Sequence, residues 1–195
     1  AFPLFAFLLV EGFFHTRDRR RYGRRLLLAA VVSEIPYDLA FSGQWMDAQH
    51  QNVCLTFFLA LVAMELLERY GNGIWEKLVL TAVFCTLTEA AGADGGAWGM
   101  GMVLAFYFCV IGNSGTNVPR PILFHEKMAG VFMKMIAAVL IGAFVWQEPL
   151  WVLALTAVCL LLYDGSKGRS RFRSFFYIYY PAHLLVLYFV GKWLG

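Results

Sequence analysis

The sequence predicts an all-α fold, a polytopic bundle of about eight transmembrane helices that forms one integral membrane domain over residues 1–195. Three observations support this prediction. Hydrophobic residues make up 60% of the chain, and only 15% of the residues are charged. A soluble domain of this size could not bury so many apolar side chains. The apolar residues also gather in runs, with nearly all of the charge between them.

The apolar runs locate the expected helices along the chain. They cover residues 1–14, 26–41, 53–67, 78–91, 98–112, 129–146, 150–163 and 175–194. A segment in lipid has no water for its backbone groups, and this favours a helix for each run. Several runs fall short of the roughly 20 residues that a span needs. Such runs can tilt or be shielded by their neighbours.

The connections between the runs carry their own signals. The first run ends in the arginine-rich stretch HTRDRRRYGRR, and the second contains Pro36. The glycine-rich turn AAGADGGAWGMG separates the fourth and fifth runs, and the basic loop DGSKGRSRFRS precedes the last. Charge, glycine and proline therefore mark where the expected helices meet.

The positions of the basic residues predict an orientation in the membrane. If the chain crosses the bilayer at every run, loops on one side hold 14 of the 16 lysines and arginines. Basic loops are retained in the cytoplasm. We therefore expect a multi-pass protein of the cell membrane, with cytoplasmic basic loops and the C-terminus outside. The bilayer explains these basic residues, so we expect no nucleic-acid partner.

The cysteines predict neither a disulfide framework nor a metal site. All of them lie in or beside apolar runs, and no CxxC or metal-like spacing occurs. They are Cys54, Cys85, Cys109 and Cys159. We interpret them as small buried apolar residues.

Ionisable residues inside apolar runs are costly and are therefore candidates for function. The first candidates are Glu11 and His15, which are four residues apart and so share one helix face. Such a pair could relay protons. The alternative is an interfacial helix end, in which Glu11 pairs with one of the arginines that follow it.

The second candidates are Glu34 and Asp38, also four apart, with Pro36 between them. Two close carboxylates repel each other, which favours a shared proton. That arrangement suits a general base acting on an amine or a hydroxyl, or the binding of a cation. The alternative is that the helix ends at Pro36 and leaves both acids in solvent.

The third candidates lie near the C-terminus. The basic loop offers side chains suited to phosphate groups, namely Lys167, Arg169, Arg171 and Arg173. The alternative is an ordinary cytoplasmic loop beside an aromatic belt. His183 lies early in the last apolar run, and a histidine can act as acid or base near neutral pH.

Two stretches resemble the TraX family of membrane proteins. They are AFPLFAFLLVEGFFHTRDRRRYGRRLLLAAVVSEIPYDLAF, residues 1–41, and LLYDGSKGRSRFRSFFYIYYPAHLL, residues 161–185. The family is named for a conjugative-pilin acetylase, which transfers acetyl from acetyl-CoA to a pilin N-terminal amine. Positions that recur in the family are matched here by Glu11, His15, Glu34, Pro36, Asp38, Tyr180, Pro181 and His183.

The chain departs from the family pattern in two places. Family members carry a further helix upstream with an Asp-His pair, whereas this sequence begins at Ala1 without a methionine. We therefore expect an N-terminal truncation and nine spans in the complete protein. The second departure is Asp164, where the resemblance leads us to expect asparagine.

The resemblance implies a membrane-embedded acetyltransferase. Acetyl-CoA, as co-substrate without a metal, would bind at the cytoplasmic face, and the acceptor would be an envelope peptide or glycan. The expected catalytic residues are Glu11, His15, Glu34, Asp38 and His183; the expected cofactor-binding residues are Arg20, Lys167, Arg169, Arg171 and Tyr180. The alternatives are a proton-coupled transporter, which also needs ionisable residues in its spans, and a non-catalytic scaffold, which needs none.

Overall fold

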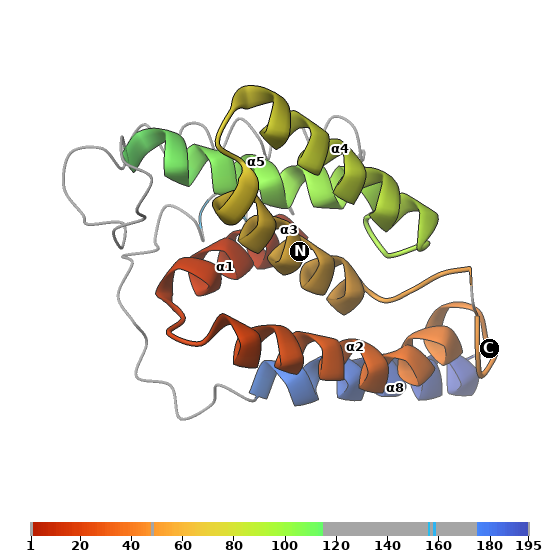
Figure 1. The fold of residues 1–195 in the computed structure, drawn as a ribbon. Helices are drawn as coiled ribbons and strands as arrows, with labels where there is room; N and C mark the ends of the chain where they lie inside the picture. Colours follow the sequence, from red (N-terminus) through yellow and green to blue (C-terminus); the bar gives the residue numbers. More distant parts are fainter. Residues whose placement is uncertain (1, 48, 115–155, 157, 159–174, 195) are drawn as a thin grey trace. The chain divides into compact units, whose positions relative to one another are not determined.

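The computed structural model describes residues 2–47, 49–114, 156, 158 and 175–194. In these ranges the chain folds into helices and one isolated bridge between Gln51 and Ala93, which confirms the all-α fold class. The helices are α1 (Phe2–His15), α2 (Arg19–Phe41), α3 (Val53–Tyr70), α4 (Ile74–Ala90), α5 (Gly96–Ser114) and α8 (Phe175–Leu194). Figure 1 draws these helices, coloured along the sequence.

Each expected run within these ranges coincides with a helix. The runs at 129–146 and 150–163 fall outside the described residues, apart from positions 156 and 158. Among the helices that are described, none is both long and apolar enough to cross a membrane. The number of spans stays a prediction, as does the single membrane domain.

Helix α2 differs from its apolar run at the N-terminus. It begins at Arg19, seven residues before the run at 26–41, so arginines expected in a loop are helical. Asp18 explains the early start, because its side chain accepts a hydrogen bond from the Arg21 N–H at 2.9 Å. A capped N-terminus and arginine's good helix propensity together allow these polar turns.

The alternative of a helix end at Pro36 is wrong. Helix α2 continues through Pro36 to Phe41 and ends when the Ser42 N–H donates to the Asp38 carbonyl at 2.8 Å. Proline removes one backbone donor inside a helix, but packing can outweigh that loss. Pro36 is buried, as is Tyr37 beside it.

The chain divides into two compact units, residues 1–17 with 98–168 and residues 18–97 with 169–195. In the first unit, α1 packs on α5 through aromatic rings. The Phe13 and Phe14 ring centroids lie 5.9 Å and 5.8 Å from that of Tyr107. Phe2 contacts Gly99 at the other end, so the two helices run in the same direction.

The second unit contains α2, α3, α4 and α8. Helix α2 packs against both α3 and α8, and α4 packs against α3. Figure 1 shows α2 and α8 side by side and running in the same direction. Polar contacts join Arg19 to Glu65 and Glu34 to Asn52, so α2 and α3 are antiparallel. A buried cluster of Ala29, Ala30 and Cys54 packs against Tyr177 and Tyr180 of α8.

Two connections meet at the end of this unit opposite Arg19. The Gln51 N–H donates to the Gly92 carbonyl at 2.8 Å, and the Asp94 N–H donates to the Gln51 carbonyl at 2.8 Å. Gly92 has φ +62°, and a Cβ there would collide with the Gln49 carbonyl. Glycine is therefore required where these connections cross.

Candidate functional site

The acidic cleft lies in the second unit, along the C-terminal half of α2. Its volume is about 530 Å³, and Glu34, Asp38 and Asp47 line it together with Gln51. Its apolar walls come from Leu27, Val31, Ile35, Leu55, Trp45 and Met46. The four-residue spacing on one continuous helix brings Glu34 and Asp38 to the same cleft.

Within the described residues, each carboxylate of α2 has one oxygen that accepts a hydrogen bond and one that accepts none. Glu34 Oε2 accepts a hydrogen bond from Asn52 Nδ2, and Asp38 Oδ2 accepts one from the Asp47 N–H at 2.9 Å. Within the described part of the chain, Glu34 Oε1 and Asp38 Oδ1 are buried without a hydrogen-bond partner. Asp38 is only 2% exposed. A buried acceptor without a donor is costly, so a ligand that donates there would be favoured.

Asp47 anchors the connection that closes the acidic cleft. Its carboxylate accepts from Ser42 Oγ at 2.7 Å and from the Gln49 N–H at 2.9 Å, and lies 3.0 Å from His50 Nδ1. The Ser42 hydroxyl, the Gln49 N–H and His50 lower the pKa of Asp47 to about 2. Asp47 therefore stays ionised at neutral pH and keeps the cleft negative.

The arginine cleft lies along the N-terminal half of α2, facing α3. Its volume is about 730 Å³, and its walls include the apolar residues Phe58, Leu61 and Val62. Its basic side chains are Arg19, Arg20, Arg24 and Arg69. Leu27 lines both this cleft and the acidic cleft, so the two clefts adjoin at that residue.

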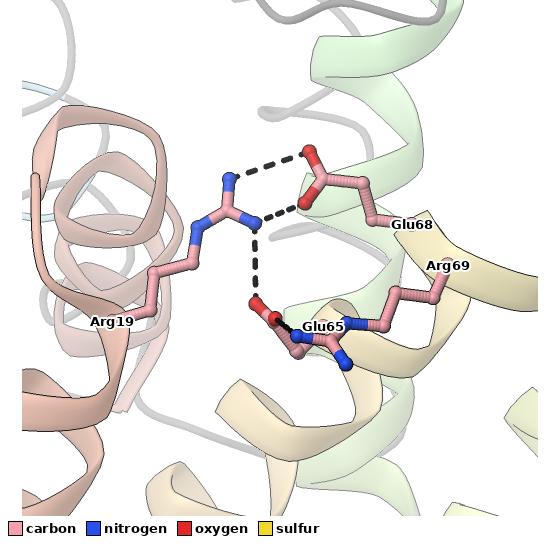
Figure 2. Close-up of polar contacts among 4 residues, drawn as sticks. All are labelled: Arg19, Glu65, Glu68 and Arg69. Atoms are coloured by element: carbon pink, nitrogen blue, oxygen red, sulfur yellow. Dashed lines mark hydrogen bonds and ion pairs between the residues drawn. The ribbon is translucent and has the colours of Figure 1, made fainter.

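Carboxylates of α3 engage two of these arginines, as Figure 2 shows. Arg19 donates to Glu65 Oε2 at 3.1 Å and binds Glu68 through both Nη atoms. Arg69 donates to Glu65 Oε1 at 2.8 Å. Among the described residues, Arg20 and Arg24 have no carboxylate partner. They are therefore the cations best placed to bind an anion.

The predicted pair of Glu11 and His15 forms in the first unit. His15 Nδ1 lies 3.1 Å from Glu11 Oε2 and 2.9 Å from the Glu11 carbonyl oxygen. Glu11 is buried at 6% exposure. The expected role of this pair in catalysis or proton relay stays a prediction.

The predicted residues of α8 pack through their aromatic rings. His183 stacks on Tyr179 with ring centroids 5.1 Å apart, and its Nδ1 lies 3.1 Å from the Tyr179 carbonyl. Tyr180 packs against the buried cluster of α2 and α3. Over the described residues, neither His183 nor Tyr180 lines the arginine cleft or the acidic cleft. Their roles stay predictions.

The expected phosphate-binding residues Lys167, Arg169 and Arg171 lie outside the described residues. Arg20, which was expected to bind the cofactor, lines the arginine cleft. Over the residues described, no group of three or more His, Cys, Asp or Glu side chains could hold a metal ion.

Sequence reasoning missed Asn52 and Asp47. Asn52 directly precedes an apolar run, which is the usual signal for a helix N-cap, but that signal says nothing about Glu34. Asp47 lies in a polar connection without periodicity. Only the fold brings its N–H to Asp38.

The chain is similar to known proteins along most of its length. The family model described as TraX protein matches residues 1–191. The probable fimbrial assembly protein FimC, serogroup H1, of Dichelobacter nodosus is 29% identical over 199 residues. That alignment covers 95% of this chain and 77% of the relative. No solved structure matches the chain.

Proposed function

The chain belongs to the TraX family, and on that premise we propose that it is an integral membrane acyltransferase that serves pilus or fimbrial assembly. It transfers acetyl from cytoplasmic acetyl-CoA to an amine or hydroxyl of an envelope acceptor, a peptide or a glycan. The similarity to a fimbrial assembly protein supports the place of the reaction in pilus biogenesis.

The observation that carries the proposal is the pair of oppositely charged clefts that adjoin at Leu27. The arginine cleft fits the phosphates of coenzyme A, because guanidinium groups bind phosphate oxygens in a planar, bidentate manner. The acidic cleft supplies carboxylates that can take a proton. Leu27 marks the point where the two clefts meet, and the thioester would lie there.

The proposed reaction needs one base and one leaving group. The unpaired oxygen of Glu34 takes a proton from the acceptor amine or hydroxyl. The nucleophile attacks the thioester carbonyl carbon, a new C–N or C–O bond forms and the C–S bond breaks. The departing coenzyme A thiolate takes up a proton, which completes the transfer.

Exposed apolar side chains support a membrane location for the second unit. On α2, Leu28 and Val31 are 64% and 67% exposed. Trp75 and Val79 on α4 and Phe189 on α8 are also exposed. Apolar surface on this scale marks a contact with lipid or with another protein. We propose that lipid covers it, with the arginine cleft toward the cytoplasm and the C-terminus outside.

The test is transfer of label from radioactive acetyl-CoA to a membrane extract, by the full-length protein in lipid nanodiscs. We expect R20Q/R24Q to raise the KM for acetyl-CoA at least tenfold, a loss of about 1.4 kcal/mol of binding. We expect Glu34→Gln to abolish transfer while coenzyme A still binds. Arg21→Gln is the matched control, because Arg21 pairs with Asp18 at 3.0 Å and lines neither cleft.

Absence of labelled product together with absence of coenzyme A binding would refute the proposed function. The paired carboxylates of the acidic cleft also favour a second candidate, a proton-coupled transporter. A transporter would move a solute into proteoliposomes in response to a pH gradient and without acetyl-CoA. Uptake in the absence of acetyl-CoA, lost in Glu34→Gln, would select that candidate.

A further inference from the structure

Asn52 is fully buried between α2 and α3, and both polar atoms of its side chain form hydrogen bonds. It is 0% exposed. Its Oδ1 accepts a hydrogen bond from the Cys54 N–H at 3.0 Å, which caps α3. Its Nδ2 donates to the Ala30 carbonyl at 2.7 Å and to Glu34 Oε2. These contacts determine the orientation of the amide.

Capping alone does not account for an asparagine at this position. Aspartate and serine cap a helix about as well as asparagine does. Neither carries the NH₂ group, which here donates to two acceptors at once. The second of these acceptors is the Glu34 carboxylate in the acidic cleft.

We infer that Asn52 is the positioning residue for Glu34: it holds Oε2 and leaves Oε1 for the group that the acceptor brings into the cleft. This inference deepens the proposed function and rests on it. The buried Oε1 without a hydrogen-bond donor is the structural consequence, because a freely rotating carboxylate would not keep its two oxygens in different states.

The Asn52 hydrogen bond also opposes the negative charges around Glu34. The carboxylates of Asp38 and Asp47 line the same cleft as Glu34. A hydrogen bond to the ionised form favours that form. Asn52 therefore helps Glu34 remain the base that the proposed reaction needs.

The inference is tested with Asn52→Asp and Asn52→Ser, which keep a capping oxygen and remove the Nδ2 donor. Infrared difference spectroscopy of the full-length protein in nanodiscs measures the protonation state of Glu34. The carboxyl C=O band is assigned by its loss in Glu34→Gln. We expect its titration midpoint to rise by roughly one pH unit in Asn52→Ser and further in Asn52→Asp, which adds a like charge.

Acetyl transfer is measured in parallel on the same preparations. We expect the pH profile of kcat to move with the infrared midpoint, while the KM for acetyl-CoA stays unchanged. An unchanged midpoint in a variant with wild-type helix content would show that Asn52 only caps α3. Loss of folding in both variants would overturn the inference in favour of a structural role. If the wild type transfers no acetyl, the proposed function fails, whereas the infrared titration still decides whether Asn52 positions Glu34.

Discussion

Replacing Arg19 by glutamine should weaken the connection between α2 and α3. Arg19 binds Glu65 and Glu68 of α3, which lie 46 and 49 residues further along the chain. Glutamine keeps much of the side-chain length and removes the charge. The three side chains are each between 26% and 29% exposed, so solvent screens their ion pairs only in part.

The expected loss follows from the number and exposure of these ion pairs. A solvent-exposed pair contributes about 0.2–1 kcal/mol to stability. Arg19 makes two partly buried pairs, and its contact with Glu68 is bidentate, which places each pair at the upper end of that range. The free energy of unfolding should therefore fall by about 1–2 kcal/mol in Arg19→Gln.

Arg21→Gln is the matched control. It makes the same substitution in the same first turn of α2, but Arg21 and its partner Asp18 are 73% and 47% exposed. The backbone cap from Asp18 does not depend on the Arg21 side chain. We expect Arg21→Gln to cost less than about 0.5 kcal/mol.

The assay is equilibrium unfolding in detergent micelles, extended to a double-mutant cycle with Glu68→Gln. The cycle should give a coupling energy of about 0.5–1 kcal/mol between Arg19 and Glu68. Equal losses in Arg19→Gln and Arg21→Gln, or a coupling energy of zero, would refute the reasoning that this network joins the two helices.

Two further predictions concern the connections beside the acidic cleft. Gly92→Ala should cost more than Gly43→Ala in the free energy of unfolding. Both glycines have positive φ, which costs an alanine about 1–2 kcal/mol, but only Gly92 would also drive a Cβ into the Gln49 carbonyl. Equal unfolding midpoints for the two variants would contradict the crossing described at Gly92.

The second prediction concerns the stability of the folded protein at low pH. The pKa of Asp47 lies below its usual 3.8, at about 2, so its contribution is present above pH 3.8 and disappears as the pH falls through 2. The stability difference between wild type and Asp47→Asn, measured by thermal unfolding from pH 5 to pH 2, should therefore shrink toward low pH. A difference that does not change with pH would show that the hydrogen bonds of Asp47 do not depend on its charge.

Local pattern was enough to predict the positions of the described helices. The apolar run at 53–67 became α3, Val53–Tyr70, because apolar runs bounded by polar residues leave few other ways to satisfy the backbone. The four-residue spacing likewise predicted that Glu34 and Asp38 would share a face. The polar segment 19–25 was predicted as a loop but forms the first turns of α2. The Asp18 cap and the helix propensity of arginine explain this difference.

The sequence by itself determined the helical class, the TraX family and the candidate carboxylates, since each depends on residues that are near one another in the chain. Only the tertiary structure decided which partners those residues meet. Asn52 reaches Glu34 across 18 residues, and Arg19 reaches Glu68 across 49. These contacts depend on the antiparallel packing of α2 and α3, which no local spacing encodes. The packing of those two helices therefore brings charged residues that are distant in the sequence together in the arginine cleft and the acidic cleft.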